Sequence, residues 1–147
     1  MKPLFLAVVL TVCLSNAAEP AAESSSSAAT TLADELKPLQ GHWEGEGAGG
    51  KCSITIEGNS LHYRNSAGWY KTTFTLPAAA NPQQLHATIK ETLPPSKDAI
   101  GTVVFAIFKI EDGTLSIATY AESDNPPKNF DDPANRYIVR KVQPQKK

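Results

Sequence analysis

The chain has 147 residues, the size of a single domain, and its 41% apolar and 20% charged residues are ordinary for a globular protein. Its 14 basic and 15 acidic residues give a formal net charge of only −1. A nucleic-acid-binding protein needs a concentrated basic face to neutralise phosphates, so we expect no nucleic-acid partner.

Residues 1–17 have the pattern of a secretory signal peptide. Lys2 gives the positive start, and residues 4–14 form an apolar core that is too short to span a bilayer. The small residues Ser15 and Ala17 predict cleavage after Ala17 or Ala18. We therefore expect an exported protein, periplasmic or extracellular.

Cys13 permits a second interpretation, in which the exported protein is a lipoprotein. The segment L-T-V-C at residues 10–13 resembles a bacterial lipoprotein box, although Val12 stands where Gly, Ala or Ser is usual. A lipidated Cys13 would anchor the protein to the cell envelope, and only then do we expect membrane association. If Cys13 is removed with the signal peptide, Cys52 is the only cysteine and no internal disulfide can form. Cys52 lies in a segment of alternating apolar and polar residues, which favours a buried, inert thiol.

Residues 18–30, which include S-S-S-S at 24–27, are too poor in apolar side chains to offset the entropy of ordering. This composition predicts a disordered tether between the leader and a folded domain over residues 31–143. A solvated tail, 144–147, follows. The domain is expected to open with a short helix over residues 31–39, capped by Thr31 and ended by Pro38.

The sequence predicts short strands for the rest of the domain. Alternation of apolar and polar residues predicts strands at about 41–46, 51–57, 61–64, 69–76, 84–90, 101–110, 115–120 and 136–142. Turn signals such as G-N at 58–59 and E-D-G-T at 111–114 separate them. The 101–110 strand is apolar on both faces and needs a cover, for which the 31–39 helix is the candidate. Short sequential connections favour an all-β, up-and-down antiparallel barrel of about eight strands.

The motif L-Q-G-H-W at residues 39–43 resembles the L-Q-G-x-W opening of uncharacterised bacterial lipocalin-like domains of the planctomycete-type secreted class. The similarity continues in I-E-G-N-S-L at 56–61, F-K-I-E-D-G-T-L-S-I at 108–117 and F-D-D-P at 130–133. The chain departs from the family after Trp43, where G-A-G-G at 47–50 turns early. The resemblance implies a lipocalin-like barrel and no particular biochemical activity.

Gly41 and Trp43 also resemble the G-x-W of true lipocalins, in which the Trp closes one barrel end beneath an arginine of the last strand. Arg140 is the candidate for that arginine. A guanidinium over an indole ring contributes a cation–π attraction of about 0.5–2 kcal/mol. Plain core packing of Trp43 is the alternative.

No catalytic residues are predicted, and no cofactor or metal. His42, Glu44 and Glu46 share one strand face, but neighbouring ligands two residues apart spread along a strand rather than converge on a metal. Cys52 and His62 would need a site that favours the thiolate, whereas Cys52 is expected among isoleucines. An enzyme would therefore have no identifiable machinery.

Two other functions remain. The inner face of the barrel could bind a small apolar or amphipathic ligand at the end away from Trp43, or it could be an ordinary filled core. In the latter case the loops at 77–82, 93–99 and 122–133 would make an envelope interaction or scaffold domain whose protein partner is unknown. The residues predicted to line a ligand site are Ile54, Tyr63, Tyr70, Phe74, Ile89, Phe108 and Ile117.

Overall fold

The structure is a computed structural model that describes residues 34–120, 123–131 and 134–143. Residues 34–36 are helical and lead into a short 3-10 helix, η1 (Lys37–Leu39). Eight strands follow: β1 (Gly41–Gly47), β2 (Gly50–Glu57), β3 (Ser60–Asn65), β4 (Trp69–Thr75), β5 (Gln84–Leu93), β6 (Val103–Glu111), β7 (Thr114–Thr119) and β8 (Asn135–Val142).

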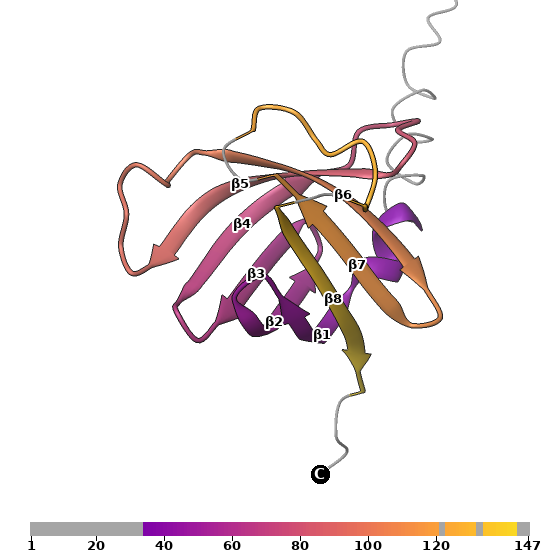
Figure 1. Cartoon of the computed structure of the whole chain (residues 1–147), viewed down its shortest axis with the longest axis horizontal. Helices are drawn as coiled ribbons and strands as arrows, with labels where there is room; N and C mark the ends of the chain where they lie inside the picture. The colour runs from indigo at the N-terminus through magenta and orange to yellow at the C-terminus, as the bar shows by residue number, and fades with distance from the viewer. Residues whose placement is uncertain (1–33, 121–122, 132–133, 144–147) are drawn as a thin grey trace, which may run out of the picture.

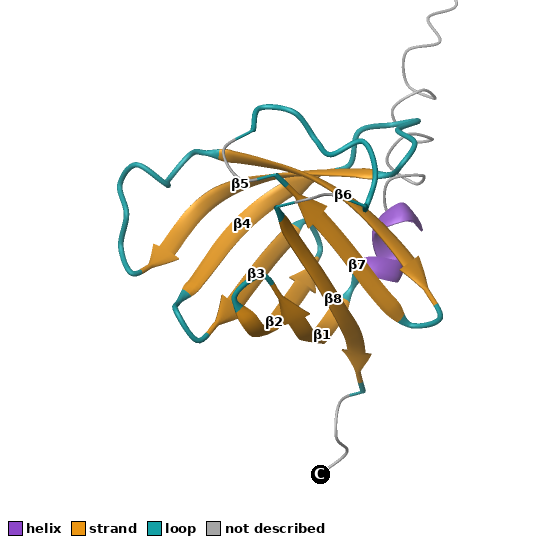
Figure 2. Cartoon of the chain, in the orientation of Figure 1, coloured by secondary structure: helices purple, strands orange, loops and turns teal. Residues whose placement is uncertain are grey.

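The strands form a closed barrel in which each strand pairs antiparallel with the next and β8 returns to β1 (Figures 1 and 2). The all-β, lipocalin-like up-and-down fold predicted from the sequence is thereby confirmed, with the short helix before the first strand. The E-D-G-T signal forms the β6–β7 hairpin. Asp112 and Gly113 there both have positive φ, 50° and 72°, as the favoured two-residue hairpin turn requires.

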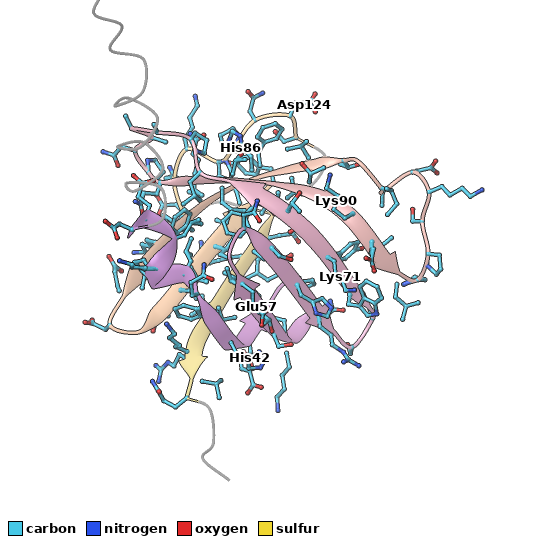
Figure 3. All side chains as sticks on the ribbon, turned by 180° about the vertical axis from the view of Figure 1, so that it is seen from behind. His42, Glu57, Lys71, His86, Lys90 and Asp124 are labelled. Atoms are coloured by element: carbon cyan, nitrogen blue, oxygen red, sulfur yellow. The ribbon has the colours of Figure 1, made fainter. Side chains whose placement is uncertain are left out.

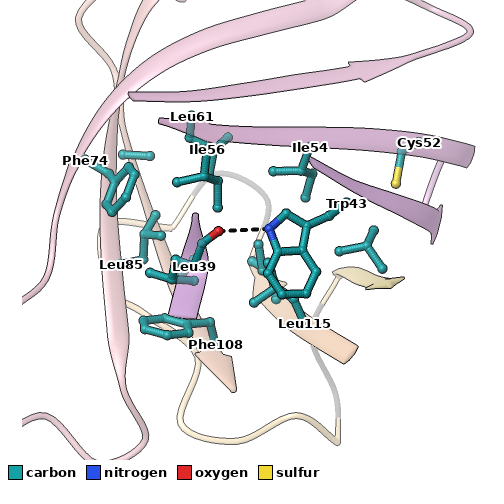
Figure 4. Packing of buried hydrophobic residues seen from close by; sticks show 14 residues of the cluster. Leu39, Trp43, Cys52, Ile54, Ile56, Leu61, Phe74, Leu85, Phe108 and Leu115 are labelled. Atoms are coloured by element: carbon teal, nitrogen blue, oxygen red, sulfur yellow. Dashed lines mark hydrogen bonds between the residues drawn. The ribbon is translucent and has the colours of Figure 1, made fainter. Parts of the chain in front are cut away.

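One end of the barrel is filled with large side chains (Figure 4). Trp43 is 1% exposed and donates its indole N–H to the carbonyl oxygen of Leu39, 2.8 Å away. Phe74 from β4, Phe108 from β6 and Leu115 from β7 pack in the same cluster. Leu39 of η1, completely buried, plugs this closed end.

The outer face of β6 and β7 is also covered. Ile107 and Ala118 pair across these strands with their side chains directed outward, yet both are 0% exposed. Segment 123–131 lies on this side (Figure 1): its Pro127 is buried, and the Phe130 ring lies 5.4 Å from Nζ of Lys109 on β6. The sequence prediction that the 31–39 helix covers this strand is not met by its described part, 34–39, since Leu36 and Leu39 pack with the core inside the barrel instead. η1 plugs the closed end, and segment 123–131 provides the outer cover.

The predicted signal peptide, Cys13, the tether, the Thr31 cap and the tail at 144–147 lie outside the described residues, as do residues 121–122 and 132–133. Within the described ranges, no helix is long and apolar enough to cross a membrane.

Candidate ligand-binding cavity

A cavity of about 670 Å³ occupies the half of the barrel away from Trp43. Its aliphatic walls come from Ile54, Leu61, Leu85, Ile89, Val104 and Ile117. The β5–β6 loop contributes Asp98, Ala99 and Thr102 to its mouth, and Asn135 begins β8 at the same end. Asp98 and Thr102 are solvent-exposed, so the cavity opens to water at this mouth. The volume lies within the range typical of small-molecule sites.

The cavity exists because the inward positions near the mouth carry small side chains. Ala87 on β5 and Ala106 on β6 line it, as do Thr72 and Thr119. At the closed end, the corresponding layer holds Trp43, Phe74 and Phe108. Side chains of alanine and threonine cannot fill the centre of an eight-stranded barrel, whereas aromatic residues and leucine can.

Tyrosines form the wall opposite the β5–β6 loop. The rings of Tyr63 on β3 and Tyr70 on β4 stack with centroids 6.2 Å apart, and the ring of Tyr137 on β8 meets Tyr63 edge to face at 5.3 Å. Asn65 donates its side-chain N–H to the Tyr63 hydroxyl at 3.0 Å. The fourth tyrosine of the lining, Tyr120, follows β7. This wall combines apolar ring area with hydroxyl groups that can orient a polar ligand group.

The acidic groups on this wall favour their neutral forms. Burial, followed by the neighbouring Tyr63, raises the pKa of Tyr137 to about 12. Burial is also the main cause of the raised pKa of Tyr63. The Cys52 thiol on β2, which pairs with Asn65 of β3, has its pKa raised by burial and then by Glu46. The surroundings of this wall therefore oppose a negative charge.

Five of the seven residues predicted to line the cavity do so: Ile54, Tyr63, Tyr70, Ile89 and Ile117. The prediction fails for Phe74 and Phe108, which are directed inward as expected but lie in the core cluster of the closed end. Alternation along a strand indicates which face a side chain occupies, but not how deep along the barrel axis it lies.

The closure predicted for Gly41, Trp43 and Arg140 needs one correction. Trp43 and Gly41 sit at the closed end, but Arg140 pairs with Glu44 and its side chain lies exposed on the outer face. Lys141, which pairs with Trp43, is the cation over the indole, with Nζ 5.3 Å from the ring centroid. A Cβ on Gly41 would lie 3.1 Å from Cε of Lys141, so the lysine stem packs across this glycine.

Neither a metal site on the β1 face nor a Cys52–His62 nucleophilic pair is formed. His42 contacts Glu44 at 3.1 Å and Thr55 at 2.9 Å on the outer wall (Figure 3). Among the described residues, no three His, Cys, Asp or Glu side chains are placed to hold one metal ion. Cys52 is directed into the barrel, whereas His62 pairs with Thr55 on the opposite face of the sheet. A Cys–His nucleophilic pair is therefore not formed.

Sequence reasoning missed several lining residues. Four of them, Thr72, Ala87, Thr119 and Tyr137, line the cavity from strands. The alternation of inward and outward side chains along a strand was the one sequence signal that could have found them. The mouth residues Asp98, Ala99 and Thr102 carry no such signal. They belong to a loop, and only the up-and-down topology places that loop at the same end as the β7–β8 connection.

Comparisons with known proteins give no match for this chain. No family model matches this chain, and no curated protein or solved structure matches it.

Proposed function

We propose that this chain is an exported, non-enzymatic, lipocalin-like domain that binds one small apolar or amphipathic ligand in its barrel. The observation that carries the proposal is the open, mainly apolar cavity of about 670 Å³ beside a fully packed closed end. Burial of an apolar ligand surface in such a cavity stabilises the complex by about 25 cal/mol for each Å² removed from water.

The lining supports binding rather than catalysis. Among the described residues around the cavity there is no Ser, Cys, His, Lys or Arg. Carboxylates and phenols also act in nucleophilic and general acid–base catalysis, but Asp98, the carboxylate of the lining, is exposed at the mouth, and burial raises the pKa of Tyr63 and of Tyr137. The hydroxyl and amide groups that are present suit orientation of a ligand.

The alternative function, an interaction domain with a filled barrel, has weaker support. The exposed apolar side chains Leu93, Ile100 and Val103 lie at the end of β5, in the β5–β6 loop and at the start of β6. None of the three lines the cavity. The unfilled mouth half of the barrel favours the ligand.

Titration with the neutral, polarity-sensitive dye N-phenyl-1-naphthylamine tests binding. We expect a saturable one-to-one rise in fluorescence. Ala87→Phe, which places a ring in the cavity, should weaken dye binding by about tenfold or more, equivalent to about 1.4 kcal/mol. The matched control is Lys90→Phe, an exposed position on the same strand, which should leave the affinity unchanged. Non-saturable binding, or equal affinity in both variants, would place the dye outside the barrel and contradict the proposal.

Export is tested separately by N-terminal sequencing of the secreted protein. The mature chain should begin at Ala18 or Glu19 with a free amine, because the apolar core and the small residues before Ala18 direct cleavage there. A chain that begins at a blocked, lipid-modified Cys13 would overturn this cleavage and indicate an envelope lipoprotein. Retention of residues 1–17 in the cytoplasm would contradict export.

A further inference from the structure

The charge within the lining of the cavity is one-sided. Asp98 is the only charged residue among the described residues that line it. The neighbouring Lys97 is exposed and is not part of the lining. An amphiphile that places its head group at this mouth therefore meets one carboxylate and no lining cation.

Several basic side chains of the barrel are engaged elsewhere. Lys71 pairs with Glu91 at 3.0 Å and Lys109 with Glu111 at 2.9 Å, both on the outside of the wall. Lys141 lies over Trp43 at the closed end. Arg136 donates to the backbone carbonyls of Phe130 and Asp131. These contacts place the four cations away from the lining.

The aromatic wall adds to the same preference. Ring faces carry negative electrostatic potential, so the stacked Tyr63 and Tyr70 and the adjacent Tyr137 attract a cation and repel an anion. The Thr72 hydroxyl already donates to the carbonyl oxygen of Leu61 at 3.1 Å, which removes it as a donor to a carboxylate. The raised pKa of Tyr137 and that of Tyr63 report the same opposition to negative charge.

We propose that the barrel selects amphiphiles by head-group charge, preferring an alkylammonium to a neutral alcohol and an alcohol to a carboxylate. The ammonium lies at the mouth beside Asp98, with its hydrocarbon chain directed between the aliphatic walls toward Leu61 and Ile117. This inference rests on the proposed function and names its ligand class. Fatty acids are thereby the disfavoured ligands of this barrel, since a carboxylate at this mouth meets the like charge of Asp98 and no cation of the lining.

The test uses the full secreted chain at neutral pH and three competitors with the same hydrocarbon chain: dodecylamine, dodecanol and dodecanoate. Each displaces bound N-phenyl-1-naphthylamine below its aggregation concentration. Dodecylammonium should compete about tenfold more tightly than dodecanoate, with dodecanol between them. Dodecanoate that competes as well as dodecylammonium would overturn the inference and leave the proposed function standing. Absence of saturable dye binding would instead remove the proposed function and this inference with it.

Two charge variants locate the head group. Asp98→Asn should reduce the advantage of dodecylammonium over dodecanol by about two- to fivefold, the value of one partly exposed ion pair, without changing the affinity for dodecanol. The control is Asp112→Asn, which removes the same charge from the β6–β7 turn at the closed end and keeps a residue type that accepts a positive φ. An equal effect of both variants would overturn the placement of the ammonium beside Asp98.

Discussion

Replacing Trp43 by Ala is expected to lower the free energy of unfolding by about 3–5 kcal/mol, the range for truncating a fully buried large aromatic side chain. Trp43 is 1% exposed and fills the closed end between Leu39 and Leu115. The carbonyl of Leu39 also loses the indole donor at 2.8 Å. Since small domains are stable by about 5–15 kcal/mol, this loss removes a large part of the total.

Urea unfolding followed by circular dichroism measures the effect, with Trp69→Ala as the matched control. Trp69 is half-buried on the outer wall, where it meets His62 edge to face and Lys71 lies 5.4 Å from its ring. Its truncation should cost about 1 kcal/mol or less, as for surface contacts of this kind. Similar small losses from both variants would show that Trp43 does not organise the closed end.

Gly45→Ala is expected to be the second severe substitution, costing about 3 kcal/mol or more, at the upper end of the range for overpacking. Gly45 pairs with Val139 where the first strand meets the last. A Cβ at Gly45 would stand 2.1 Å from the carbonyl oxygen of Ile138 and 2.8 Å from Cα of Val139. Both atoms belong to the backbone, so relief requires β1 and β8 to separate and lose ladder hydrogen bonds.

Gly113→Ala is the control for this prediction. Gly113 has a φ of 72° and open space where a Cβ would be placed, so the variant carries only the left-handed strain of about 1–2 kcal/mol. Thermal unfolding of the two variants should show a larger decrease in Tm for Gly45→Ala. If Gly45→Ala yields only aggregated protein while Gly113→Ala remains folded, the expected order of severity also stands. A smaller loss for Gly45→Ala than for Gly113→Ala would contradict the close approach of β1 and β8.

The fold follows from the sequence because strand alternation and short turns act locally. Ile54 and Ile56 alternate with Ser53 and Thr55, and this period of two selects the buried face of β2 before any tertiary contact is known. The hairpin at Asp112 is equally local, since its turn type depends on two residues. Sequential hairpins of this kind leave few alternatives to a barrel or meander.

The position of the cavity could not be derived in the same way. Phe74 and Tyr70 occupy the same face of β4, yet Phe74 is buried in the closed end and Tyr70 is 40% exposed at the mouth. Their difference is depth along the barrel axis, which depends on strand tilt and on the register of all eight strands. The choice of Arg140 over Lys141 was a smaller error. Inward positions on β8 are two residues apart, so the inward position after Val139 is Lys141, which pairs with Trp43.

The cover of β6 shows a third limit of sequence reasoning. The outer apolar face of this strand predicted that something must lie on it, and that expectation was correct. The occupant is an irregular segment, 123–131, whose buried Pro127 and half-buried Phe130 have no periodic pattern. Only a long-range contact, such as that between Lys109 and Phe130, reveals which part of the chain returns to the strand.

The pairing of β1 with β8 has a consequence for how the protein folds. Gly45 and Val139 are neighbours across this pair although they lie at opposite ends of the domain sequence. Bringing such distant segments together carries a large loop-closure entropy, which slows folding relative to proteins with local contacts. Until β8 has been synthesised and docked, β1 and β7 remain open sheet edges that can pair with other chains. Completion of the last strand is therefore the step that protects the nascent protein from aggregation.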